Sequence, residues 1–203
     1  SLHTWDGWAR ELSTERRVVR PDLPGFGLTG PTPDGVYTLD RYASFVRALL
    51  DHLGIQRCVL VGNSFGGTVS IATILAIPER VTKLVLIDSG GYSLAGVSMP
   101  IAFRIANIPV LNRLMAVVLP RSVIESSVRD VYGDPSKVTA ELVDRYYEIA
   151  LREGNRRALV ERFRQVPLEG VPDLIAKLKL PTLILWGGRD RREQRDRARW
   201  FER

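Results

Sequence analysis

VLVGNSFGGTVSIA, residues Val59–Ala72, is the stretch that decides the fold. A short apolar run leads into Gly62, a serine stands between glycines, and a second apolar run follows. This pattern predicts a buried strand that turns directly into a helix, with Ser64 at the corner. Such a corner strains the backbone and leaves little room, so Gly62 and Gly66 are both predicted to be positions that cannot carry a Cβ. The Ser64 hydroxyl would then stand clear of the backbone, which favours a nucleophile.

The predicted helix also supplies groups that suit a serine nucleophile. Its first N–H groups have no partner inside the helix, and its positive end faces the same point. An oxyanion formed by attack of Ser64 on a carbonyl would be stabilised by the Phe65 N–H. Gly67 would let the helix pack closely on its neighbours. Two alternatives are a glycine-rich turn that happens to contain serine, and a phosphate-binding loop. The phosphate loop is disfavoured because neither a G-K-[ST] ending nor a G-x-G-x-x-G spacing is present.

The flanking sequence predicts alternating strands and helices. Unalternating apolar strands separated by helices are typical of a parallel sheet covered by helices, and therefore of an α/β fold. In the first ninety residues we expect a strand at Arg17–Arg20, a helix at Thr38–Leu53 ended by Gly54, a strand at Arg57–Val61 buried on both faces, a helix at Phe65–Ala76 ended by Pro78, and a strand at Lys83–Ile87.

The alternation then stops and resumes near the end. Residues 91–172 contain helical segments and no clear strand, and the firmest helix is predicted at Ser136–Leu151. A strand is predicted at Leu180–Trp186, with a helix at Arg191–Arg203. The predicted division is therefore 1–90 as the first part of a sheet-containing core, 91–172 as an inserted helical cap, and 173–203 as the continuation of the core.

These motifs together resemble the α/β-hydrolase family over nearly the whole chain. PDLPGFG (residues 21–27) resembles the loop after its fourth strand, GNSFGG (62–67) its nucleophile elbow, and 180–190 its seventh strand with the following loop. The resemblance is closest to small bacterial esterases and carbon–carbon bond hydrolases with a serine nucleophile. Haloalkane dehalogenases have aspartate at this position, so Ser64 speaks against that chemistry. The resemblance implies no cofactor and no metal, and a catalytic triad in which Asp190 is the acid.

Asp88 and the residues after Asp190 both bear on which residue is the triad acid. Asp88 also ends a predicted strand at the same edge, and we interpret it first as a strand-end or turn residue and only then as a substitute acid. After Asp190 the family usually continues with apolar residues and a proline, whereas Arg191–Gln194 reads RREQ. The segment that follows Asp190 therefore departs from the family pattern, whereas the elbow matches it.

No histidine follows Asp190, although the family order is serine, aspartate, histidine. The two histidines of the chain are His3 and His52. His52 lies in a predicted helix remote from the elbow, and His3 is not at the triad position, so it is only a weak candidate for a substitute base. The family's His-Gly oxyanion loop would also precede Ser1. We therefore expect a fragment that lacks both ends, and an inactive one.

Composition narrows the classes of partner. The 203 residues, 45% of them hydrophobic, suit one compact domain, and no apolar run is long enough to span a bilayer. The single cysteine, Cys58, fits a reducing compartment and hence a cytoplasmic location. The net charge of +6 is carried mostly by arginines scattered among acids, so no nucleic-acid or membrane partner is predicted.

The sequence thus predicts a cofactor-free serine hydrolase. Ser64 would attack an ester or related carbonyl, and the apolar residues of the cap give a modest preference for an apolar or acyl small molecule. A carbon–carbon bond hydrolase and a cofactor-free perhydrolase would use the same triad. A catalytically silent binding protein on the same fold is the alternative outside enzymes. The oligomeric state is not predicted.

Overall fold

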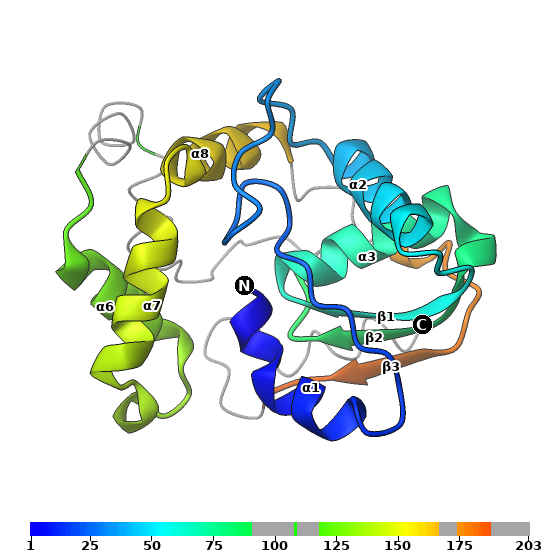
Figure 1. Ribbon diagram of the computed structural model, residues 1–203, viewed down its shortest axis with the longest axis horizontal. Helices are drawn as coiled ribbons and strands as arrows, with labels where there is room; N and C mark the ends of the chain where they lie inside the picture. The colour runs from blue at the N-terminus through cyan, green and yellow to red at the C-terminus, as the bar shows by residue number, and fades with distance from the viewer. Residues whose placement is uncertain (91–107, 109–117, 167–173, 188–203) are drawn as a thin grey trace.

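Three parallel strands form one sheet in the computed structural model, which describes residues 1–90, 108, 118–166 and 174–187 (Figure 1). The strands are β1 (Cys58–Asn63), β2 (Val81–Ile87) and β3 (Thr182–Leu185), in the order β1-β2-β3. Asn63 is paired with Ile87, and Ile87 with Leu185, so the three strands end together at one edge of the sheet. The predicted α/β fold with a parallel sheet is confirmed.

The central strand is buried, whereas its neighbours are not buried on both faces. Leu84 and Leu86 of β2 are buried, while Val59 of β1 is 46% exposed and Leu183 of β3 is 54% exposed. The prediction that the β1 segment is buried on both faces is therefore wrong. Each outer strand has a single neighbour among the described strands, so its side chains are covered less completely than those of β2.

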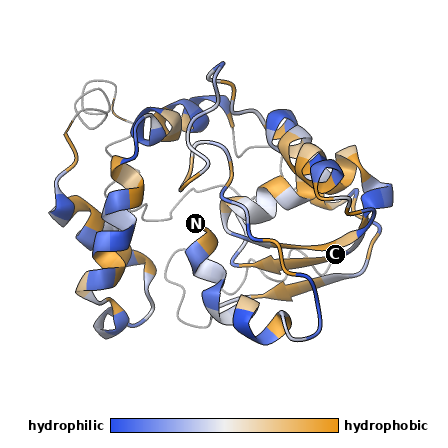
Figure 2. Cartoon of the chain, in the orientation of Figure 1, coloured by the Kyte–Doolittle hydropathy of each residue, from blue (hydrophilic) through white to orange (hydrophobic). Residues whose placement is uncertain are grey.

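Helices α2 (Leu39–His52) and α3 (Phe65–Ala76) lie against each other, and α3 packs on β1 and β2 (Figure 1). Ile71 and Ile74 of α3 form a buried cluster with Val81, Leu84 and Leu86 of β2. Figure 2 shows that the three strands consist mostly of hydrophobic residues, whereas α8 is largely hydrophilic. Helix α3 has the bounds predicted from sequence.

The predicted caps of α2 are also confirmed. The Thr38 side chain accepts a hydrogen bond from the Arg41 N–H, which satisfies a free donor at the start of the helix. Gly54 follows the helix with φ +66°, a conformation that favours glycine.

Two sequence predictions are corrected. Arg17–Arg20 is not a strand, because a strand needs a hydrogen-bonding neighbour and no described segment pairs with it. The helix predicted from Ser136 begins later, as α7 (Ala140–Leu151). The Thr139 side chain accepts the Leu142 N–H and so fixes the start of α7, while Pro135–Lys137 form the short helix η3.

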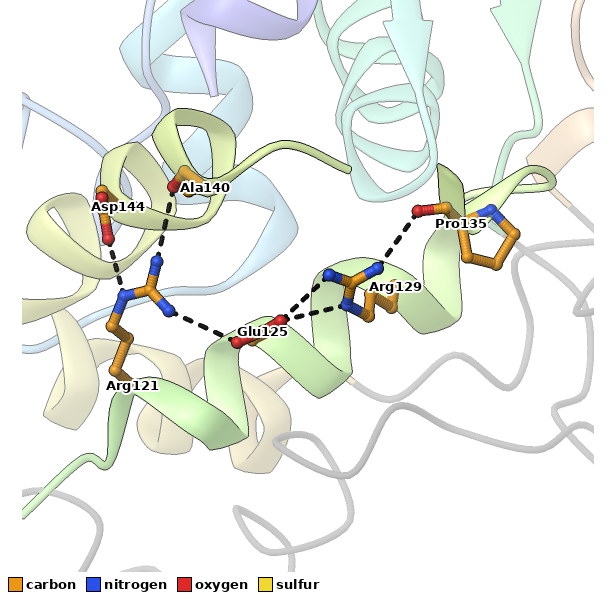
Figure 3. Close-up of polar contacts among 6 residues, drawn as sticks. All are labelled: Arg121, Glu125, Arg129, Pro135, Ala140 and Asp144. Atoms are coloured by element: carbon orange, nitrogen blue, oxygen red, sulfur yellow. Dashed lines mark hydrogen bonds and ion pairs between the residues drawn. The ribbon is translucent and has the colours of Figure 1, made fainter. Parts of the chain in front are cut away.

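Among the residues that the structure describes between β2 and β3, three α-helices occur: α6 (Arg121–Val131), α7 and α8 (Asn155–Gln165). Helix α6 contacts α7, and α7 contacts α8 (Figure 1). Helix α8 also reaches the first part of the chain, because its Ala158 is buried in one cluster with Tyr42 of α2 and Val69 of α3. Arg121 of α6 donates to Asp144 of α7 at 2.6 Å, and Glu125 accepts from both Arg121 and Arg129 (Figure 3). These exposed ion pairs add little stability singly, and apolar clusters around Val128 and Val143 hold α6 on α7. The boundaries of the predicted insertion, 91 and 172, lie outside the described residues.

The remaining short elements are η1 (Leu2–Trp5), α1 (Asp6–Leu12) and η2 (Pro78–Arg80). The amino-terminal end lies between α7 and the sheet (Figure 1). Arg145 of α7 lies 3.7 Å from the carboxylate of Asp6, which links the first helix to the helical insertion. None of the helices that the structure describes is long and apolar enough to cross a membrane.

Candidate active site

Ser64 stands at a strained corner between β1 and α3. Its backbone has φ 50° and ψ −123°, a conformation that residues with a Cβ rarely adopt, and its side chain is exposed. The Ser64 N–H lies 3.1 Å from the carbonyl oxygens of both Ile87 and Asp88, at the end of β2. The neighbouring strand therefore holds the backbone of the corner in place, and strain of this kind typically persists at functional sites.

The glycines around Ser64 have different roles. A Cβ at Gly62 would lie 2.5 Å from the carbonyl oxygen of Gly66, so this position cannot accept a side chain without backbone movement. A Cβ at Gly67 would collide with the Ser89 hydroxyl and lie 2.7 Å from the Ser89 Cβ. At Gly66, however, a Cβ would meet no atom of the described residues within 4 Å. The prediction that Gly66 must lack a Cβ is wrong, because its Cα faces open space. Gly67 makes the close approach instead.

Phe65 is the first residue of α3, and its N–H has no acceptor among the described residues. Its ring is fixed from several sides. The ring of Tyr42 meets it edge-on with centroids 5.1 Å apart, and the ring of Phe26 lies 5.9 Å away. Tyr42 is fully buried, and its hydroxyl donates to the Pro24 carbonyl at 3.1 Å. The residue that carries the free N–H is thus anchored to both α2 and the 21–30 loop.

The end of β2 completes the corner. The Gly90 N–H donates to the Ser64 carbonyl at 3.0 Å, and the Thr68 hydroxyl donates to the Gly90 carbonyl at 3.1 Å. Asp88 has φ 42°, and its carboxylate accepts the Gly187 N–H at 2.7 Å. Asp88 therefore connects the ends of β2 and β3, as a strand-end residue does.

The predicted acid and the histidines are not brought to Ser64 by the described part of the chain. Asp190 lies outside the described residues, which reach Gly187 just after β3. His52 is an exposed residue at the end of α2, and His3 lies in η1 with Nδ1 3.7 Å from the Asp6 carboxylate. Neither histidine hydrogen-bonds to Ser64. In the described residues no group of three or more His, Cys, Asp or Glu is placed to hold a metal ion.

A cavity of about 730 Å³ lies between the amino-terminal end, the 21–30 loop and α7. Its lining carries three carboxylates, two guanidinium groups and one imidazole: Glu141, Asp144, Glu148, Arg145, Arg152 and His3, with Gly27, Leu28 and Ile149. This charged lining was not predicted from the sequence, where the apolar residues of the cap indicated an apolar substrate. Many of those, including 99–103 and 111–117, lie outside the described residues.

Two buried charged residues were also missed. Asp22 is 4% exposed, and its two carboxylate oxygens accept the N–H groups of Leu2 at 2.7 Å and Leu28 at 2.9 Å, so it orders the 21–30 loop. Arg162 of α8 is 7% exposed and contacts the Phe65 ring. Helical periodicity could have indicated the burial of Arg162, because it follows the buried Ala158 by four residues and so lies on the same face of α8.

Comparison with known proteins identifies the fold family. A family model described as the alpha/beta hydrolase fold matches residues 1–200. The chain is 33% identical over 190 residues to a 2-hydroxymuconate semialdehyde hydrolase of Pseudomonas putida, covering 88% of this chain and 62% of that protein. It is 31% identical over 176 residues to the uncharacterised hydrolase YugF of Bacillus subtilis (strain 168), covering 86% of this chain and 63% of YugF. The chain thus spans less than two thirds of the length of either relative.

A solved structure shows the same fold. The meta-cleavage product hydrolase from Pseudomonas fluorescens IP01 superposes with a TM-score of 0.79 at 24% sequence identity, covering 98% of this chain and 72% of that one.

Proposed function

The chain belongs to the α/β-hydrolase fold family, and on that premise we propose that Ser64 is the nucleophile of a hydrolase that acts on a carbonyl compound. One observation carries the proposal: Ser64 is exposed in a strained conformation beside an N–H that lacks an acceptor among the described residues. A turn without a function gains nothing from this strain, whereas a nucleophile gains access to substrate.

In the proposed reaction, Ser64 Oγ attacks the carbonyl carbon while its proton passes to a histidine of the whole protein. The Phe65 N–H binds the oxyanion that forms. The histidine then returns the proton to the leaving group, and water releases the acyl group from Ser64 by the reverse sequence of proton transfers. Asp190 orients the histidine and stabilises its charged form without taking the proton.

Two bonds are candidates for cleavage. Ester hydrolysis follows from the nucleophile alone. Carbon–carbon bond hydrolysis is supported by the relatives, since the names of the Pseudomonas putida and Pseudomonas fluorescens proteins describe hydrolases of 2-hydroxymuconate semialdehyde and of meta-cleavage products.

We also propose the division into core (1–90 and 173–203) and helical cap (91–172). It is supported by the position of α6, α7 and α8 between β2 and β3 in the sequence. A cytoplasmic location remains a proposal that rests on the single free cysteine, Cys58.

A fluorophosphonate probe tests the nucleophile in the whole protein. We expect one label per chain, on the peptide that contains Ser64, and none in Ser64→Ala. Ser70→Ala is the matched control, since Ser70 lies on the same helix and its hydroxyl donates to the Gly66 carbonyl. Labelling that persists in Ser64→Ala would disprove the assignment.

Turnover of two substrates then distinguishes ester hydrolysis from carbon–carbon bond hydrolysis. Ser64-dependent hydrolysis of p-nitrophenyl butyrate supports the esterase, and Ser64-dependent loss of absorbance from 2-hydroxymuconate semialdehyde supports the carbon–carbon hydrolase. If the unlabelled protein binds such compounds without turning either over, the binding-protein alternative is favoured.

A further inference from the structure

Arg162 is a buried cation without a counter-charge among the described residues. Its side chain is 7% exposed, no carboxylate of the described chain lies within ion-pair distance, and its Nε has no hydrogen-bond partner. Burial lowers the pKa of the Arg162 guanidinium to about 10, so the group still carries its charge near neutral pH.

Aromatic rings surround this charge. The guanidinium carbon lies 4.1 Å from the ring centroid of Phe163, 4.5 Å from that of Phe65 and 5.6 Å from that of Phe26. The rings come from α8, α3 and the 21–30 loop, so Arg162 bridges the helical insertion and the nucleophile corner. The Tyr42 hydroxyl is bonded to the Pro24 carbonyl and is therefore not the missing partner.

Packing alone does not require an arginine here. A cation–π contact returns only part of the hydration free energy that an ion loses when it is taken out of water. Apolar residues of similar volume often replace buried charges without loss of stability. Methionine would fill the same space among the rings without a buried, unpaired Nε–H.

The position of the charge indicates what it serves. Phe65 links Arg162 to the proposed nucleophile, because its ring contacts the guanidinium and its N–H, next to Ser64 in the sequence, is the proposed oxyanion donor. A fixed positive charge in a water-poor setting stabilises negative charge that develops nearby more strongly than it would in water. The ground-state carbonyl compound gains much less from it, since its reacting oxygen is uncharged.

We propose that Arg162 is a positioning residue that acts through Phe65: it holds the oxyanion donor in place and adds positive potential that favours the tetrahedral intermediate over the bound substrate. The inference rests on the proposed function of Ser64. It assigns a task in the reaction to α8, a helix that contributes no atom to the nucleophile corner itself.

The test uses the whole protein with Arg162→Met, Arg162→Lys and the control Arg164→Met. Arg164 lies on the same helix with 71% of its side chain exposed and pairs with Glu161 at 3.5 Å. In Arg162→Met we expect kcat per titrated Ser64 to fall by roughly ten- to a hundredfold with KM within about twofold, because the lost interaction exists only in the transition state. Arg162→Lys should recover part of kcat, and Arg164→Met should match the wild type.

A second measurement excludes simple loss of structure. The urea midpoint of Arg162→Met should equal or exceed that of the wild type, since an unpaired buried charge is removed. Unchanged kcat in Arg162→Met, a change confined to KM, or a lowered urea midpoint would each overturn the proposal.

The failure of this inference differs from failure of the proposed function. If Ser64→Ala abolishes turnover while Arg162→Met does not reduce it, the nucleophile stands and Arg162 has no part in the reaction. If wild-type turnover does not depend on Ser64, both assignments fall.

Discussion

Gln165 is hydrogen-bonded to the backbone of Tyr37, 128 residues away in the sequence. Its Oε1 accepts the Tyr37 N–H at 2.8 Å, and its Nε2 donates to the Gly35 carbonyl at 2.9 Å. One amide side chain at the end of α8 therefore satisfies both a donor and an acceptor of the segment that leads into α2. These two hydrogen bonds fix the helical insertion to the part of the chain that packs behind Phe65.

Gln165→Ala should destabilise the fold, because the Tyr37 N–H and the Gly35 carbonyl both lose their partner. We expect the free energy of unfolding in urea to fall by roughly 1–3 kcal/mol. Gln56→Ala is the control, since Gln56 is exposed and its side chain makes no hydrogen bond among the described residues. Equal stability of the two variants would show that the Gln165 bonds contribute nothing net.

Alanine at Gly67 and at Gly66 should have opposite effects. The Cβ at position 67 would collide with Ser89, so we expect a loss of roughly 1–3 kcal/mol in the free energy of unfolding. At position 66 the Cβ meets nothing, and alanine in the first turn of a helix should raise stability by about 0.5–1 kcal/mol. Urea unfolding of the two variants decides the matter, and a Gly67→Ala variant as stable as the wild type would contradict the close packing.

Tyr42 should make stability fall at alkaline pH. Burial raises the pKa of the Tyr42 hydroxyl well above its usual value. In the folded state this hydroxyl therefore stays protonated at a pH near 10, where the same hydroxyl ionises in the unfolded chain. Its contribution is fully present below about pH 10 and declines as the pH rises toward the higher folded-state pKa. Tyr42→Phe should lose about 1 kcal/mol at pH 8, through the bond to Pro24, and show a shallower decline between pH 9 and 11. Parallel slopes in urea titrations of both proteins would refute this account.

The 203-residue chain on its own should have no turnover of p-nitrophenyl butyrate above the uncatalysed rate. Neither His3 nor His52 contacts Ser64, so no imidazole is in place to accept its proton. His3→Ala should therefore leave the rate at the same background value. Ser64-dependent turnover by this chain that disappears in His3→Ala would identify His3 as the base and reverse the expectation.

The local features of the site could be predicted from the sequence, because local rules decide them. The glycine spacing around Ser64 sets the corner, and the caps at Thr38 and Gly54 set the ends of α2. The exposed Val59 and the absence of a strand at Arg17–Arg20 depend instead on which strands lie alongside. Strands that pair in a sheet can lie far apart in the sequence, so the sequence of one segment does not show which strands will lie beside it.

The parts of the site that lie beyond the elbow depended on tertiary contacts. Gly66 fits the family motif, but a Cβ there would contact none of the described residues, whereas the close packing predicted at Gly67 is confirmed. Arg162 is one of many arginines in the sequence, and only the packing of α8 on Phe65 distinguishes it. The composition predicted that the arginines lie scattered on the surface, whereas the Arg162 side chain is buried.

The contact between Asp88 and Gly187 gives the loop after β3 a fixed origin. Because the Asp88 carboxylate holds the Gly187 N–H at the same strand end that holds Ser64, the chain leaves β3 at a point already set relative to Ser64. Substitutions beyond Gly187 can therefore change what the loop carries without changing where it starts.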